Sequence, residues 1–214
     1  MIGATFDGTP FAPTQGKQWE GGVKYDARGL GDDIKLFATA AVFRIDQTNV
    51  LTTDTRAGAP LFAQIQEGKV KSEGAELEVV GRFHEKLSVN ASYSFTNARV
   101  ALGDNAGARL AAQPRHKASL LVDYTHDVGA LAGFGGGAGI RYLSNSPGIV
   151  GAPYYYSPSV TVFDGTLHYD IPGWRLAVNG SNLFDKRYAG RCSGQYSCFF
   201  GEGRQVVGTV TKKF

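Results

Sequence analysis

Polar and apolar residues alternate along most of this chain. From residue 87 to residue 96, every odd position is apolar and every even position is polar. A period of two residues predicts a β-strand with one apolar and one polar face. The pattern recurs, and one further segment, 34–45, is apolar on both faces. Together these segments predict nine strands, which include residues 19–25, 34–45, 75–79, 87–96, 118–124, 134–142, 163–169, 174–178 and 206–210.

The predicted connections between these strands alternate in length. Short connections cover 27–33, 81–86, 127–133 and 170–173, and long ones cover 46–66, 100–113, 144–159 and 185–203. A transmembrane β-barrel has this arrangement, with short turns on one side of the membrane and long loops on the other. Tilted strands of about 9–11 residues are long enough to cross the bilayer. A secreted β-sandwich with one solvated face is the alternative, but it gives no reason to gather every long loop at one end.

Composition agrees with an all-β chain and excludes several other classes. Gly (29), Phe (13) and Tyr (10) are abundant and Met (1) is rare. A hydrophobic content of 43% excludes a disordered chain, and a dispersed net charge of +3 is too weak for nucleic-acid binding. No apolar run approaches the roughly 18 residues of a transmembrane helix. The first seven residues have neither the basic nor the apolar region of a signal peptide, so we expect none in this sequence.

The number of strands suggests that the sheet is incomplete. Bacterial transmembrane barrels have an even number of strands, whereas nine are predicted. Only a closed sheet leaves no backbone group unpaired in lipid, so the apolar face would meet lipid and the polar face a lumen. Aromatic residues near the strand ends fit the girdles at the two membrane interfaces. They are Trp19, Tyr25, Tyr93, Tyr124, Tyr142, Tyr169 and Trp174.

Specific motifs carry a resemblance to a known family. Residues 182–188, Asn-Leu-Phe-Asp-Lys-Arg-Tyr, resemble a signature of TonB-dependent outer-membrane receptors. The ending, 192–207, is most similar to the ferrichrome-type hydroxamate receptors of that family. Three further segments resemble its siderophore-receptor branch: 47–54, 68–78 and 113–120. The resemblance covers 17–214 in matching order.

The resemblance implies a fold and a division of the chain. Receptors of this family have a 22-stranded barrel, so 17–214 would be its C-terminal portion and 1–16 a loop before the first strand. The family's plug domain, TonB-binding segment and signal peptide are not expected in this sequence. Phe214 fits the terminal aromatic that the barrel-assembly machinery uses. Lys212 stands where an aromatic is usual, close to the interface, where a lysine costs roughly 0–1 kcal/mol.

The resemblance also implies a function. The chain would be the barrel part of a receptor that takes up a ferric siderophore of the hydroxamate class across the bacterial outer membrane. Its partners would be outer-membrane lipid, the siderophore and the barrel-assembly machinery, with the plug and the TonB complex only in a full-length receptor. We expect no enzyme activity, no cofactor and no resident metal, and no activity of this piece alone. A structural or passive barrel, or a non-functional truncated remnant, is the alternative.

Cysteines and aromatics in the long loops are the candidate binding residues. Cys192 and Cys198 would form a disulfide in an oxidising compartment or two free thiols in the cytosol, and the barrel interpretation favours the disulfide. The aromatics of two loops could pack against the periphery of an iron chelate, whose metal is already saturated. The alternative is an interface girdle or loop packing. These residues are Tyr154, Tyr155, Tyr156, Tyr196, Phe199 and Phe200.

Other titratable residues are expected to have structural roles. The four histidines, His84, His116, His126 and His168, lack a metal-binding spacing. His168 faces the predicted lumen, but no serine in register completes a hydrolase site. The remaining lumen-facing charges would solvate the wall or contact a plug: Lys24, Glu76, Glu78, Asp123, Arg141, Asp164 and Arg175.

Overall fold

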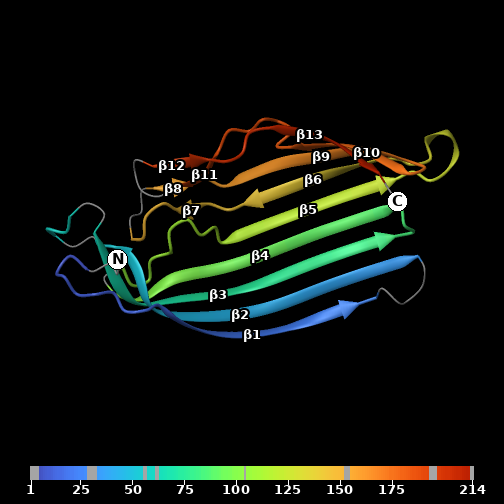
Figure 1. Ribbon diagram of the computed structural model, residues 1–214. Helices are drawn as coiled ribbons and strands as arrows, with labels where there is room; N and C mark the ends of the chain where they lie inside the picture. Colours follow the sequence, from blue (N-terminus) through green and yellow to red (C-terminus); the bar gives the residue numbers. More distant parts are fainter. Residues whose placement is uncertain are drawn as a thin grey trace.

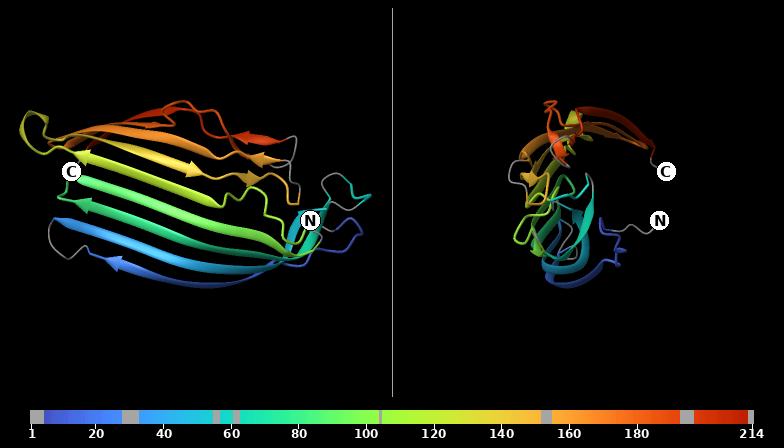
Figure 2. Two further views of the ribbon diagram at one scale, coloured as in Figure 1. Left: turned by 180° about the vertical axis from the view of Figure 1, so that it is seen from behind. Right: turned by 90° about the vertical axis from the view of Figure 1, so that its left-hand side faces the viewer.

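The computed structural model describes residues 5–27, 33–54, 57–60, 63–103, 105–151, 155–192 and 197–212. They form one nine-stranded antiparallel sheet, which curves into an open arc (Figures 1 and 2). The strands are hydrogen-bonded in chain order, β1-β2-β3-β4-β5-β6-β9-β10-β13, and two short ribbons, β7-β8 and β11-β12, lie outside the sheet. The prediction of an all-β antiparallel sheet with nine strands is confirmed.

The strands of the sheet are β1 (Gln15–Asp26), β2 (Ile34–Thr53), β3 (Gln64–Phe83), β4 (Leu87–Leu102), β5 (His116–Thr125), β6 (Phe134–Leu143), β9 (Val160–Ile171), β10 (Trp174–Ser181) and β13 (Gln205–Lys212). The ribbons consist of β7 (Ser146–Pro147) with β8 (Tyr156–Ser157), and β11 (Ala189–Cys192) with β12 (Cys198–Phe200). A single 3-10 turn, η1 (Gly129–Leu131), is the helical element of the described chain. Among the described residues, no helix has the length and apolar character needed to cross a membrane.

Strand register keeps the two faces of the sheet chemically separate. Residues directly opposite each other in a ladder point to the same face, so each row across the sheet has one character. A row on the polar face contains Lys24, Thr39, Glu78, Ser92, Ser119 and Arg141. The adjacent row on the apolar face contains Tyr25, Ala38, Val79, Ala91, Leu120 and Ile140. The alternation in the sequence therefore becomes two continuous surfaces.

Long and short connections lie at opposite ends of the strands, as the sequence predicted. The short turns and the C-terminus are at one end, and the long connections and the N-terminal segment are at the other (Figure 1). We call the latter the loop end. It consists of the connections 54–63, 103–115, 144–159 and 182–204.

The structure corrects the extent of one predicted loop. The connection predicted over 46–66 is mostly strand, because β2 continues to Thr53 and β3 already begins at Gln64. The two strands pair along this extension, from Asp46–Lys71 to Thr53–Gln64, with one interruption at Asn49 and Gly68. Backbone pairing therefore makes this extension a strand although the side chains do not alternate regularly, and at the interruption the Asn49 carbonyl accepts from the side chains of Thr14 and Gln66. The ribbons inside the two last long connections were also not predicted.

Buried side chains gather at the loop end, because a single sheet has no second layer to cover it. Val70 and Val100 are each 1% exposed beneath the connection 103–115. This connection folds back on β4, and the Val100 N–H donates to the Ala108 carbonyl at 3.0 Å. By contrast, large apolar side chains along the middle of the sheet, such as Leu77 and Leu120, stay exposed.

At the end of the sheet opposite the loops, Lys212, which stands where the receptors that the chain resembles usually have an aromatic residue, has an aromatic partner. Lys212 pairs with Trp174 across β10 and β13, and its Nζ lies 5.7 Å from the centroid of the indole ring. A cation held over an aromatic face is attracted by the ring quadrupole. Phe214, predicted to be an assembly signal, lies outside the described residues.

Candidate functional site

The polar face of the sheet forms a broad hollow. It has a volume of about 960 Å³ and extends from β1 across to β9, with Tyr188 from the last long connection also contributing. The charged residues that line it come from four strands, β1, β3, β5 and β6: Glu20, Lys24, Glu76, Glu78, Lys117 and Arg141. Tyr188 was not singled out from the sequence, although it is the last residue of the motif that carried the resemblance.

Arg141 is held at the edge of this hollow by a two-pronged ion pair. Its Nε and Nη2 donate to the two carboxylate oxygens of Asp164, at 2.6 and 2.8 Å. Asp164 also accepts the backbone N–H of Asn182 at 2.9 Å. Bidentate pairing fixes both side chains in one orientation. Two predicted lumen charges, on β6 and β9, are therefore joined to the first residue of the last long connection.

Asn182 is the structural centre of the motif 182–188. Its side chain is 2% exposed, and its Nδ2 donates to the carbonyls of Lys186 and Glu202, each at 3.0 Å. Its Oδ1 accepts the Lys186 N–H at 2.9 Å. The Asn182 side chain is therefore bonded to backbone groups near both ends of the connection. Asn182 has φ +48°, a left-handed conformation that asparagine tolerates better than most residues. The motif thus closes the base of the last long connection.

His168 lies in the polar face between two carboxylates. Its Nε2 is 3.1 Å from Asp123 Oδ1 and its Nδ1 is 3.5 Å from Asp170 Oδ2, which also accepts from Arg175 Nη1 at 2.9 Å. The ring packs so closely on Gly135 that a Cβ there would lie 2.3 Å from its Cε1. Both ring nitrogens face carboxylates and not a hydroxyl nucleophile. This cluster ties β5, β9 and β10 together.

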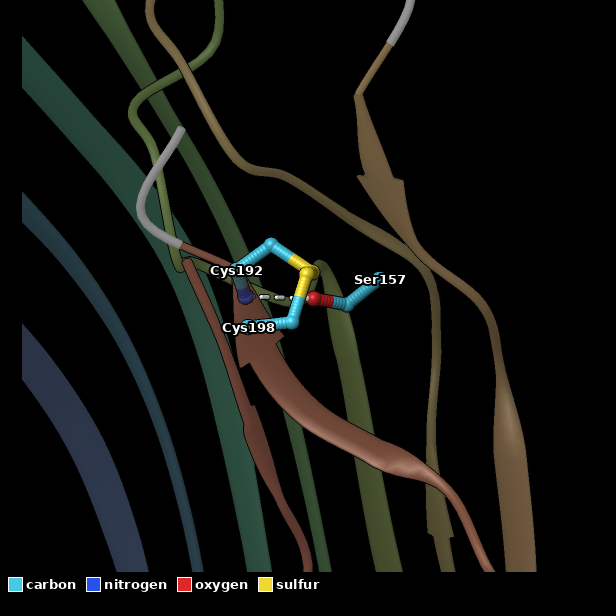
Figure 3. The surroundings of a disulfide bond; sticks show 3 residues. All are labelled: Ser157, Cys192 and Cys198. Carbon is cyan, nitrogen blue, oxygen red and sulfur yellow. Dashed lines mark hydrogen bonds between the residues drawn. A yellow bond between two sulfur atoms is a disulfide. The ribbon is translucent and has the colours of Figure 1, made fainter. Parts of the chain in front are cut away.

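The predicted disulfide is present and closes the β11–β12 ribbon. The Cys192–Cys198 bond spans the two strands, and the Cys192 N–H donates to Ser157 Oγ at 2.9 Å (Figure 3). Both Cys192 and Ser157 are buried. Since Ser157 belongs to β8, the hydrogen bond docks one ribbon of the loop end on the other.

The predicted aromatics that the structure describes lie on these two ribbons. Phe199 and Phe200 on β12 are 52% and 84% exposed, and the Arg191 guanidinium lies 5.0 Å from the Phe199 ring centroid. Tyr156 on β8 is exposed, and Tyr155 just before it is half-buried. The docked ribbons place these residues at the loop end. Tyr154 and Tyr196 lie outside the described residues, and the binding role of all six stays a prediction.

Comparison with known proteins gives one matching family. Residues 2–183 match the model of the TonB dependent receptor-like β-barrel. Among curated proteins, the ferrichrome outer membrane transporter/phage receptor of Escherichia coli K12 is 36% identical over 97% of this chain. The ferrioxamine B receptor of Salmonella typhimurium SL1344 is 33% identical over 97% of it. The chain spans 28% and 29% of the length of these two relatives.

Solved structures agree on the fold. The closed form of the ferric-catecholate import receptor Fiu from E. coli K12 has a TM-score of 0.73 and 27% identity, over 99% of this chain and 29% of that one. The ferric yersiniabactin uptake receptor FyuA from Yersinia pestis has a TM-score of 0.74 over 96% of this chain and 31% of its own, at 20% identity. The relatives named here are transporters and receptors.

Proposed function

Because this chain belongs to the TonB-dependent receptor-like β-barrel family, we propose that it forms part of an outer-membrane barrel that takes up a ferric siderophore of the hydroxamate class. The observation that carries the proposal is the two-faced, nine-stranded sheet with its long connections at one end. The hydroxamate class is supported by the receptors for ferrichrome and ferrioxamine B, at 36% and 33% identity. The ferric-catecholate receptor is 27% identical.

The apolar face has the dimensions of a lipid-facing band. On β3 the apolar positions run from Ala75 to Phe83, and on β4 from Leu87 to Phe95. Such a run of roughly nine residues rises about 30 Å, which a strand tilt of about 40° reduces to nearly the 25 Å of a barrel's apolar band. Beyond it the same face becomes charged, beginning with Arg44 and Glu73. The proposed membrane therefore ends at this row, and the loop end lies outside the cell.

The hollow on the polar face would then face the barrel lumen. Acidic Glu76 and Glu78 and basic Lys24 and Lys117 lie along it, a mixture suited to a protein surface with charges of both signs. In a full-length receptor we propose that this face contacts a plug domain and that the TonB complex supplies the energy. The plug and the segment that binds TonB would belong to the part of the receptor that this chain does not cover.

The loop-end aromatics would receive the chelate. Hydroxamate oxygens already saturate the iron, so the protein would contact the periphery of the complex, where apolar and aromatic surfaces suit it. The disulfide and the Cys192–Ser157 hydrogen bond limit the motion of β12 before Phe199 and Phe200. A wall that is already ordered loses little entropy when a ligand binds.

Uptake of radiolabelled iron tests the proposal. The complete reading frame that contains this chain is expressed in cells without other hydroxamate receptors, and uptake of ferrichrome, ferrioxamine B and a ferric catecholate is compared. We expect TonB-dependent uptake of a hydroxamate and none from residues 1–214 alone. Uptake of the catecholate only would refute the hydroxamate class. Passive, TonB-independent uptake would support the alternative of a simple pore.

A further inference from the structure

Three arginines converge at the loop end of β4 and β5. Arg99 lies on β4 and is the antiparallel bridge partner of Arg109, in the connection that follows. Arg115 is the residue before β5. Arg99 Nε and Arg115 Nη2 donate to the same atom, Asn97 Oδ1, at 3.1 and 3.3 Å. Two guanidinium groups are thus held side by side over one neutral acceptor.

The partners of this arginine cluster are neutral wherever the structure describes them. Arg99 Nη1 donates to the Gly107 carbonyl at 2.6 Å, whereas the bonds of Arg109 to Asn145 and Gln113 are longer, at 3.1 to 3.4 Å. Arg115 Nε is buried without a hydrogen-bond partner. Among the described residues, no carboxylate lies within ion-pair distance of the three guanidinium groups.

Electrostatics favour an anion at this place. Burial and the neighbouring charges of Arg115 and Arg99 lower the pKa of Arg109 from its ordinary value. The nearby Arg44, at a similar height on β2, is instead compensated, since its Nε bonds to Asp46 at 2.9 Å. Like charges brought together are costly unless an opposite charge compensates them, and among the described residues no carboxylate lies within ion-pair distance of these arginines.

We propose that Arg99, Arg109 and Arg115 form a binding site for a phosphate-type oxyanion. Arginine suits this chemistry because its planar fork donates two parallel hydrogen bonds to phosphate oxygens. Asn97, the acceptor that Arg99 and Arg115 share, lies one row beyond Phe95 at the edge of the apolar face, where Phe95 and Tyr93 pack with His116. If that face meets lipid as proposed above, a headgroup phosphate can reach the cluster. A soluble phosphate offers the same chemistry.

The test measures binding to the complete receptor in neutral detergent and in bilayer nanodiscs. Inorganic pyrophosphate is titrated by calorimetry in detergent. In nanodiscs, the melting temperature is compared between pure phosphatidylcholine and phosphatidylcholine with added phosphatidylglycerol. Arg109→Gln and Arg115→Gln remove cluster charges, and Arg44→Gln is the matched control, an arginine that already has an acidic partner.

We expect at least one probe to bind. Arg109→Gln and Arg115→Gln should each weaken its affinity by about tenfold, which corresponds to one charge-assisted hydrogen bond. Arg44→Gln should leave the affinity unchanged. Stabilisation by pyrophosphate identifies a soluble oxyanion, and stabilisation by anionic lipid alone identifies a headgroup. Without any anion, Arg109→Gln should leave the melting temperature unchanged or raise it, because it removes an uncompensated charge. The proposal would be overturned if neither probe binds, or if Arg44→Gln loses as much affinity as the cluster variants. It would also be overturned if Arg109→Gln lowers the melting temperature of the receptor while its affinity for the probe stays unchanged.

Discussion

In the nine-stranded sheet, the strands are held mainly by repeated backbone pairing, and the side chains on each face mostly share only their polarity. At the loop end, individual side chains make the connections: Asn182 bonds backbone on both sides of its loop, and Ser157 receives the Cys192 N–H. Of the buried polar residues in the described chain, Asp54, Ser146, Ser157 and Asn182 are at the loop end and only His168 is in the sheet. The sheet therefore depends on a pattern, whereas the loop end depends on particular residues.

The largest expected effect comes from Asn182→Ala. The substitution leaves the Lys186 N–H and the carbonyls of Lys186 and Glu202 without this partner, which should lower the free energy of unfolding by about 3 kcal/mol. Urea unfolding of the complete receptor, with protease cleavage within 182–204 as a local readout, measures it. Asn179→Ala, an exposed asparagine on β10, is the control and should change little. Equal losses in both variants would contradict the contrast between sheet and loop end.

Gly135→Ala tests whether the sheet, like the loop end, contains a position that requires one particular residue. The added Cβ would lie 2.3 Å from His168 Cε1 and 2.6 Å from the Tyr124 carbonyl oxygen. We expect a loss of about 1–3 kcal/mol, typical of an overpacked site. The added Cβ of Gly208→Ala, on β13, meets nothing within 4 Å, and this variant should be close to neutral. Thermal melts of both variants make the comparison, and a neutral Gly135→Ala would mean that the His168 cluster is easily displaced.

Removal of the disulfide should act on ligand binding more than on the stability of the barrel. The ring is small, so Cys192→Ser with Cys198→Ser should lose less than the roughly 3 kcal/mol of a 15-residue loop. Siderophore affinity should fall more strongly, because Phe199 and Phe200 are no longer held. Tryptophan fluorescence or calorimetry on the complete receptor measures the affinity.

Phe199→Ala and Phe200→Ala should reproduce part of that loss. Phe184→Ala is a suitable control, since this exposed ring packs edge-on against Phe163 and is not part of the ribbon. Unchanged affinity in the disulfide and phenylalanine variants would assign the ribbon to structure alone.

The smallest effect concerns a turn at the end opposite the loops. Asp127 accepts a hydrogen bond from Lys86 Nζ at 2.8 Å, which lowers the pKa of Asp127 below its ordinary value of 3.8. A carboxyl with a lowered pKa stabilises the fold above its unfolded pKa, and the contribution disappears as the pH falls through the folded value. Asp127→Asn should therefore slightly flatten the melting-temperature profile below about pH 4, and only slightly because the pair is exposed. An unchanged acid limb would mean that the pair contributes nothing.

The sequence predicted those features that depend on a local period or spacing. Strict alternation located β4, and the barrel interpretation built on that alternation favoured a disulfide between the two cysteines. The extension of β2 and β3 could not be predicted, because residues 46–53 and 64–70 do not alternate and are strand through pairing with each other and with the neighbouring strands β1 and β4. The contact between Cys192 and Ser157 and the convergence of Arg99 with Arg109 and Arg115 depend on how long connections fold back. No local pattern in the sequence records that.

The central claim is that one face of this sheet meets lipid and the other a lumen. Spin labels placed singly at residues 88 to 93 of β4, in the complete receptor in bilayers, measure it directly through collisions with lipid-soluble oxygen and a water-soluble nickel chelate. We predict that labels at Val89, Ala91 and Tyr93 are accessible to oxygen, while labels at Ser88, Asn90 and Ser92 are shielded from it, with a period of two. Uniform oxygen accessibility along β4, or greater accessibility at the even positions, would contradict the account.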